Sequence, residues 1–88
     1  MSARPLSTIA QEIAKEWPKA MEVAIVPGWG ETSHPARPYI VAMSLLMDIH
    51  ENYYADSGTS VVRYFLSNAG QWRGESARRI KAELKGML

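Results

Sequence analysis

Apolar residues recur at helical spacing near the start of the chain. In residues 7–17 they occupy one side of the pattern, and Gln and charged residues fill the other. The apolar positions are Ile9, Ala10, Ile13, Ala14 and Trp17. Because side chains three and four apart share a helix face, the pattern predicts a helix over 7–17, continuing to about 21 if Pro18 only kinks it. Ser7 is the predicted N-cap, since its hydroxyl can accept a free N–H of the first turn.

Three more helices are predicted farther along the chain. Residues 37–50 are apolar nearly all round, which is typical of a helix in the middle of a domain. Residues 57–69 carry one apolar stripe, and Asp56 or Ser57 is suited to cap this helix. Residues 73–87 carry an apolar stripe beside a basic one. The apolar side chains of this last helix that we expect to face the core are Ala77, Ile80, Leu84 and Met87 or Leu88.

The segment AMEVAIVPGWGETSHPARP, residues 20–38, breaks the helical pattern with prolines and glycines. Within it MEVAIV favours a short extended piece and PGWG a turn. Its large apolar side chains are costly to leave in water; they are Val23, Ile25, Val26 and Trp29. We expect the segment to fold down over the core as a flap. The alternative is that these side chains stay exposed as a partner-binding patch, with Trp29 as its anchor.

Together these elements predict an all-α fold. We expect a compact bundle of about four short helices with one irregular apolar loop at about 20–36. At 88 residues the chain is expected to form a single helical domain over 1–88. Hydrophobic residues make up 47% of it, a share too high for a disordered chain.

Composition excludes several kinds of chemistry. The chain has no cysteine, which rules out disulfides, thiolate zinc sites and cysteine nucleophiles and fits a reducing cytoplasm. The opening MSARPLST lacks the apolar stretch of a signal peptide, and no apolar run is long enough to span a bilayer. We therefore expect a cytoplasmic protein with no membrane partner.

No catalytic or metal-binding motif is found. His34 and His50 have acids near them in the sequence, but their spacing fits no metal-ligand pattern. No serine belongs to a nucleophile motif. We expect no catalytic residues, no metal, no cofactor and no enzymatic activity.

Charge is unevenly distributed along the chain. Residues 1–60 contain four basic residues and seven acids, a net charge of −3. Residues 61–88 contain six basic residues and two acids, a net charge of +4. In the last helix Glu75 and Glu83 lie four residues before and after Arg79, so we expect them to pair with it. Four basic side chains are left without an expected partner: Arg73, Arg78, Lys81 and Lys85.

These four cations define an alternative function. A basic stripe can follow a phosphate backbone, and Trp72 and Tyr64 would add stacking surfaces for bases. A solvated helix face is the preferred explanation of the stripe. A pI near 8.1 lies below the range typical of nucleic-acid-binding domains. Nucleic acid therefore stays the second choice of partner.

Most of the chain resembles a family of short proteins encoded by bacteriophages and prophages, mainly of Gram-positive bacteria. The resemblance rests on PLSTIAQEIAKEW (5–17), RPYIVAMSLLMDI (37–49) and NYYADSGTSVVRYFLSNAGQWRGESARRIKAELKGML (52–88). Its most telling pieces are ADSG, YFLSNA and WRGESARRIKAEL. At 20–34 this chain is longer than the family pattern. The family has no assigned activity, so the resemblance implies only a phage or prophage accessory protein acting inside a bacterial host cell.

These features together predict a small protein that acts by binding rather than by chemistry. The expected partner is a host or phage protein, which the chain would regulate or inhibit, for example in a defence system of the host. The alternative is a nucleic-acid-associated protein that uses the basic stripe. A virion or assembly component, which would form a homo-oligomer, is the third hypothesis.

Overall fold

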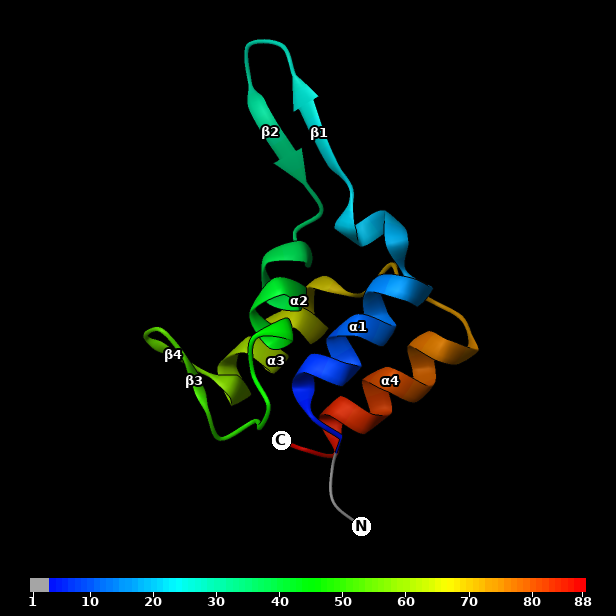
Figure 1. Cartoon of the computed structure of the whole chain (residues 1–88). Helices are drawn as coiled ribbons and strands as arrows, with labels where there is room; N and C mark the ends of the chain where they lie inside the picture. The colour runs from blue at the N-terminus through cyan, green and yellow to red at the C-terminus, as the bar shows by residue number, and fades with distance from the viewer. Residues whose placement is uncertain (1–3) are drawn as a thin grey trace.

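The computed structural model describes residues 4–88. Residues 1–3, which belong to the MSARPLST stretch, lie outside the described residues. Within the described part the chain forms four α-helices and one short 3₁₀-helix (Figure 1). They are α1 (Leu6–Glu16), η1 (Pro18–Met21), α2 (Arg37–Ser44), α3 (Gly58–Asn68) and α4 (Glu75–Lys85). None of these helices has the length and apolar character needed to cross a bilayer.

Two small antiparallel sheets accompany the helices. Their strands are β1 (Val23–Val26), β2 (Gly30–Ser33), β3 (Asn52–Tyr53) and β4 (Asp56–Ser57). The prediction of an all-α fold is therefore wrong, and the protein is a small mixed α/β globule. The irregular loop expected at 20–36 is in fact a turn of 3₁₀-helix followed by a hairpin. The hairpin forms because Val and Ile favour extended backbone and the glycines permit a tight turn.

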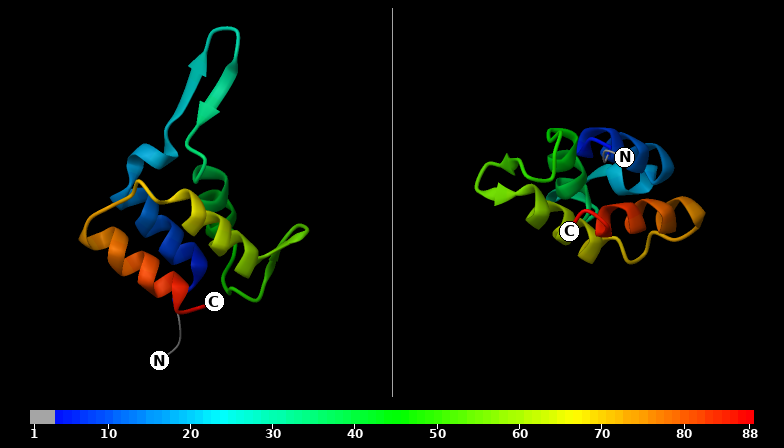
Figure 2. Two further views of the ribbon diagram at one scale, coloured as in Figure 1. Left: turned by 180° about the vertical axis from the view of Figure 1, so that it is seen from behind. Right: turned by 90° about the horizontal axis from the view of Figure 1, so that it is seen from below.

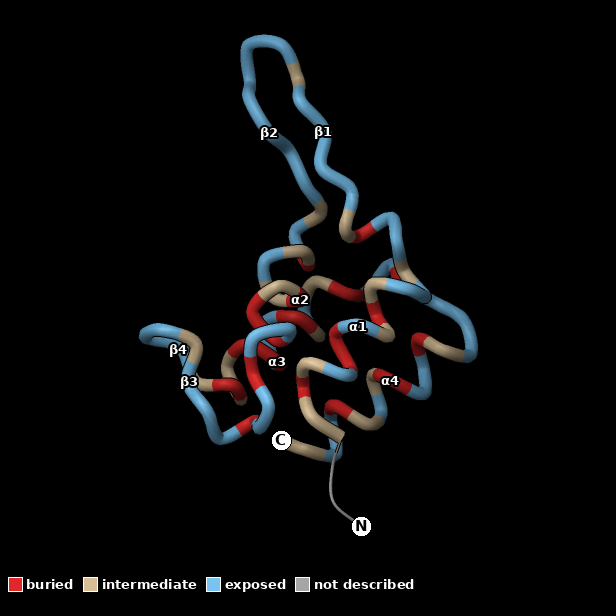
Figure 3. Tube along the Cα trace, viewed as in Figure 1, coloured by how far each residue is buried: buried red, intermediate tan, exposed pale blue. Residues whose placement is uncertain are grey.

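One hydrophobic core lies between the four helices. Each helix contributes buried residues to this core, and they are the red segments of the tube in Figure 3. Each helix contributes at least two fully buried residues. Among them are Ile9 and Ile13 of α1, Ile40 and Met43 of α2, Val62 and Phe65 of α3, and Ile80 and Leu84 of α4. Ala77, Ile80 and Leu84 of α4 face this core as the sequence predicts, Met87 is half-buried, and Leu88 is exposed.

Helix α1 begins one residue earlier than predicted, and Ser7 does not cap it. The backbone N–H groups of Leu6 and Ser7 instead donate to the carbonyls of Met47 (3.1 Å) and Leu46 (2.8 Å). These carbonyls belong to the segment after α2, about forty residues away in the sequence. The free N–H groups of the first turn are thus satisfied by a tertiary contact, which leaves no need for a side-chain cap.

Helix α2 ends at Ser44 rather than at residue 50. Just beyond it the carboxylate of Glu51 accepts hydrogen bonds from the backbone N–H groups of Met47 (2.7 Å) and Asp48 (2.8 Å). Such local side-chain bonds compete with the helical carbonyls for the same donors. His50, at the end of the predicted helix, is consequently exposed in a turn.

Helix α3 begins as predicted. Ser57 is its N-cap, and its hydroxyl oxygen accepts the backbone N–H of Ser60 at 3.1 Å. Helix α4 begins at Glu75, two residues later than predicted, with that carboxylate in its first turn. An acid at this position interacts favourably with the positive end of the helix dipole.

Candidate partner-binding hairpin

The β1–β2 hairpin is built by residues that each fit their place in it. Val23 to Val26 pair with Ser33 to Gly30 in regular antiparallel register. The connecting turn is closed by the N–H of Trp29, which donates to the carbonyl of Val26 at 2.9 Å. Pro27 and Gly28, the latter with φ of 84°, occupy the two central positions of this turn. This is a type II turn, which favours proline first and needs glycine second.

The hairpin does not fold down over the core. It stands away from the helices, and most of its length is exposed (Figures 1 and 3). Ile25 is 80% exposed, Trp29 83% and Val23 42%, while Val26 is half-buried. The predicted buried flap is therefore wrong. The strands pair with each other along one edge, their other edges are exposed to water, and the helices already enclose a core without these side chains.

The base of the hairpin, unlike its tip, is firmly packed. Ala20 before it and Ala36 after it are fully buried. The ring of His34 meets Trp17 edge-on at 4.8 Å between centroids, and its Nδ1 accepts the N–H of Ala36 at 3.0 Å. Trp17 in turn stacks on Trp72 of the core. The fold thus presents an exposed apolar tip on a stem that the core holds in place.

The hairpin segment carries only negative formal charge. Between residues 20 and 36 the acids are Glu22 and Glu31, both exposed, and no Lys or Arg occurs. An acidic surface repels the phosphates of nucleic acid. The hairpin therefore suits a protein partner better than a nucleic acid.

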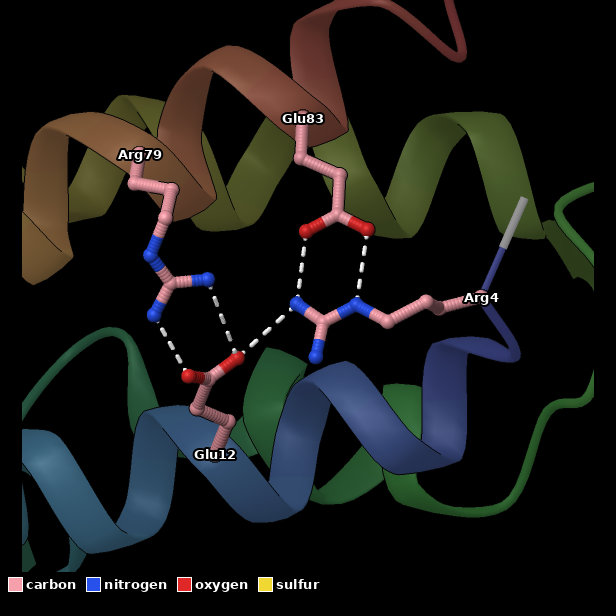
Figure 4. A network of polar contacts seen from close by, with 4 residues as sticks. All are labelled: Arg4, Glu12, Arg79 and Glu83. Atoms are coloured by element: carbon pink, nitrogen blue, oxygen red, sulfur yellow. Dashed lines mark hydrogen bonds and ion pairs between the residues drawn. The ribbon is translucent and has the colours of Figure 1, made fainter. Parts of the chain in front are cut away.

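Part of the basic character of α4 is neutralised within the fold. Arg79 pairs with Glu12 of α1, with Nη2 and Oε2 2.5 Å apart, and not with Glu75 or Glu83 of its own helix as predicted (Figure 4). Packing of α4 beside α1 brings a carboxylate to Arg79 that the sequence places 67 residues away. The hydrogen bonds from Arg79 and then from Arg4 hold the pKa of Glu12 below its ordinary value.

Arg4 completes this network, which sequence reasoning missed. Its guanidinium donates to both carboxylate oxygens of Glu83, at 2.8 and 2.6 Å, and lies 2.8 Å from Glu12 (Figure 4). The bidentate hydrogen bond from Arg4 lowers the pKa of Glu83. No sequence pattern signals this contact, because the two residues are 79 positions apart.

Within residues 4–88 no ion pair is formed by the four cations of the predicted basic stripe, which are Arg73, Arg78, Lys81 and Lys85. Arg73, Arg78 and Lys85 are exposed. Lys81 is half-buried, and its ammonium donates to the carbonyl of Trp72 at 2.6 Å. Burial, followed by the charges of Lys85 and Arg73, lowers the pKa of Lys81. These cations therefore form a positive surface without an internal counter-charge.

The aromatic residues expected to assist nucleic-acid binding do not fit that role equally. Trp72 is buried and stacked on Trp17, so its ring faces are not available to bases. Tyr64 is about half exposed but packs against Tyr39 at 5.5 Å between centroids. The basic surface thus lacks an open stacking platform of the kind that single-strand binders use.

Metal-ligand clusters and cavities are the other features that could form a site. Within residues 4–88 no group of three or more His, Asp or Glu side chains lies close enough together to hold a metal ion. A cavity of about 250 Å³ lies near the chain ends, lined by Met47, Ile49, His50 and Met87 among others. Arg4 also lines it, but this guanidinium is engaged with Glu12 and Glu83.

Comparison with known proteins adds no assignment: no family model, no curated protein and no solved structure matches the chain. The resemblance to phage proteins consequently stays a prediction. The function has to be inferred from the two surfaces described here, the apolar hairpin and the basic face of α4.

Proposed function

We propose that the protein acts by binding another protein through the β1–β2 hairpin, with Trp29 as the anchor. The observation that carries this proposal is the exposure of Ile25 and Trp29 on a stem fixed by buried residues. Large apolar side chains that are held out in water mark interaction surfaces. Tryptophan is also the residue type most enriched among those that dominate binding energy.

The phage resemblance suggests the setting of this binding. The segment at 20–34 that lengthens the chain beyond the family pattern is the segment that forms the hairpin. We therefore infer a phage or prophage accessory protein that works in the bacterial cytoplasm. Its partner would be a host or phage protein, regulated or inhibited on contact, as in an anti-defence protein.

A capture experiment tests this proposal. The tagged protein is incubated with nuclease-treated bacterial lysate, in parallel with Trp29→Ala and Tyr54→Ala variants. Tyr54 is the matched control, because it is an aromatic residue 87% exposed at the tip of the other hairpin. We expect a lysate protein to be captured by the wild type and by the Tyr54→Ala variant. The Trp29→Ala variant should not capture it. Equal capture by all three would show that the hairpin tip is not the contact.

A second candidate function is binding of a nucleic-acid backbone by Arg73, Arg78, Lys81 and Lys85. The observation that favours it is that these cations lack an acidic partner within the described residues. Binding would weaken steeply with salt, because each phosphate contact releases counterions. Affinity for duplex DNA or RNA that does not change between low and physiological salt, or that survives a triple Arg78/Lys81/Lys85→Glu substitution, would exclude it.

A further inference from the structure

We propose that the free edge of β1 receives an extended segment of the partner protein as a third strand, and that this segment carries Lys or Arg among apolar residues. This inference rests on the proposed function and specifies how the hairpin binds. It concerns the backbone of β1 and the charge of the hairpin, whereas the proposed function concerns the side chain of Trp29.

The sheet formed by β1 and β2 has an open edge along β1. Within the described residues β1 pairs only with β2. A strand in a ladder points alternate N–H and C=O groups to each side, so half of those in β1 face solvent. Figure 1 and the left view of Figure 2, taken from opposite sides, show the hairpin extending away from the helices with no other element beside its strands. A hairpin of two strands alone is only marginally stable, and a third strand would complete it.

Of the two strands, β1 has the edge better suited to pairing. β1 has the sequence Val-Ala-Ile-Val, with no charged side chain and three β-branched residues. Proteins usually block a free edge with lysine, proline or a bulge, and none of these occurs within β1. The other strand is less suitable, because β2 carries Glu31 and begins at Gly30, whose φ of 79° departs from extended geometry. The unprotected edge is therefore that of β1.

The charge of the hairpin favours one occupant. A second copy of the chain would add its own Glu22 and Glu31 to a hairpin that already carries two acids, with no Lys or Arg from residues 20–36 of either copy. Charge of one sign on both partners opposes their association, whereas complementary charge favours it. A strand with Lys or Arg flanking apolar residues would match both the carboxylates and the β-branched edge. Charge thus favours a basic, apolar segment of a different protein.

A displayed library of random twelve-residue peptides, selected against the full chain, tests the proposal. We expect the enriched peptides to alternate apolar with other residues, to carry Lys or Arg, and to lack proline at their centre. Synthetic copies of them are then added to the protein, and amide hydrogen exchange is followed. Exchange of the solvent-facing β1 amides should slow about tenfold or more, because they become hydrogen-bonded, while exchange at the outer edge of β2 stays unchanged.

Two lysine variants provide matched controls for the edge. Ile25→Lys places on β1 the residue that natural edge strands use against pairing, and we expect at least about tenfold weaker peptide binding. Thr32→Lys adds the same charge to the hairpin on β2, away from the free edge, so a loss of affinity common to both variants is electrostatic and the larger loss expected for Ile25→Lys reports on the edge. Both positions are exposed, and circular dichroism with urea unfolding checks that both variants fold like the wild type.

The outcomes separate this inference from the proposed function. If no peptide is enriched, or if bound peptides protect other amides than those of β1, strand addition is wrong. A captured protein can depend on Trp29 for binding and yet leave hydrogen exchange of the β1 amides unchanged. In that case the proposed function stands and strand addition is wrong. A dimer seen by sedimentation, with β1 amides protected before any peptide is added, would show that a second copy is the occupant and overturn the choice of a basic partner strand.

Discussion

The indole of Trp17 stacks on the indole of Trp72, with ring centroids 5.3 Å apart and planes within 1° of parallel. Trp17 follows the end of α1, and Trp72 lies in the connection between α3 and α4. Phe65 meets Trp72 from the core side, and His34 meets Trp17 from the hairpin side. The stack therefore links the core of the helices to the stem of the hairpin.

Replacement of Trp72 should be strongly destabilising. Trp72→Leu removes a large part of a buried ring and leaves a cavity beside Trp17, so we expect a loss of about 2–4 kcal/mol in the free energy of unfolding. The measurement is urea denaturation followed by circular dichroism. Trp29→Leu is the control and should change this free energy by less than about 0.5 kcal/mol, because its ring lies in solvent. Equal effects of the two substitutions would contradict the placement of both rings.

The tryptophans should also differ in their access to a quencher. Trp29 is 83% exposed, Trp72 is 5% exposed, and Trp17 is half-buried. We expect acrylamide to quench the fluorescence of the wild type in a strongly accessible and a weakly accessible fraction. Trp29→Phe should remove the accessible fraction and shift the remaining emission to shorter wavelength. A variant that keeps the accessible fraction would show that Trp29 is covered, for example by self-association.

The Arg4–Glu12–Arg79 contacts predict a specific dependence of stability on pH. The pKa of Glu12 is lowered in the folded state, so its contribution is present above the unfolded value of about 4.3 and is lost as pH falls through the lower folded value. We expect Glu12→Gln to cost about 1 kcal/mol at pH 7, since exposed pairs contribute little and this one is partly screened. The cost should begin to shrink as pH falls through about 4.3 and disappear once pH is below the lowered pKa of Glu12 in the folded state.

Glu16→Gln is the control for this pH effect. Glu16 lies on the same helix, is exposed, and forms no ion pair within residues 4–88. Its substitution should leave the pH profile of stability unchanged. A deficit of Glu12→Gln that stays constant between pH 7 and pH 3 would show that the side chain acts through packing rather than through charge.

Gly58 is expected to tolerate no side chain. It begins α3, where alanine is ordinarily the better helix former, but an added Cβ would lie 2.4 Å from the carbonyl oxygen of Ile49 and 3.1 Å from that of Glu51. Its N–H donates to the same Glu51 carbonyl at 2.7 Å, so the close approach is needed. We expect Gly58→Ala to lower the free energy of unfolding by about 2 kcal/mol or more.

Gly70→Ala supplies the comparison for that prediction. A Cβ at Gly70 meets nothing within 4 Å, and its φ lies outside the left-handed region. Alanine there should be neutral or stabilising by up to about 1 kcal/mol, because it restricts the unfolded chain. Thermal unfolding of both variants measures the two changes in stability. A mild effect of Gly58→Ala would mean that α3 and the segment at 49–51 are not in close contact.

The helices were predictable from the sequence, but their ends were only partly so. Apolar spacing places all four helices, and Ser57 is recognisable as a cap because its bond is local. Ser7 has the same chemistry, yet its helix is capped by carbonyls of residues 46 and 47. The early end of α2 was missed because Glu51, outside the predicted helix, takes the N–H groups of residues 47 and 48.

The candidate site was predictable as a set of residues but not as a surface. Val23, Ile25, Val26 and Trp29 stand out in the sequence as apolar residues in a segment broken by proline and glycine. Hydrophobicity favours burial of such residues, and this led to the wrong expectation of a flap. Sequence alone could not reveal that Ala20 and Ala36 are buried at the stem while the hairpin between them stays exposed.

The sequence by itself determined the helices, the turn at Pro27 and Gly28, and the absence of cysteine chemistry, because each depends on residues close together in the chain or on composition alone. Tertiary structure decided which apolar residues are buried and which charges are neutralised. Arg79 meets Glu12, and Arg4 meets Glu83, only because α4 packs beside α1. Contacts between residues some 70 positions apart depend on how the helices pack, and local sequence patterns do not predict that packing.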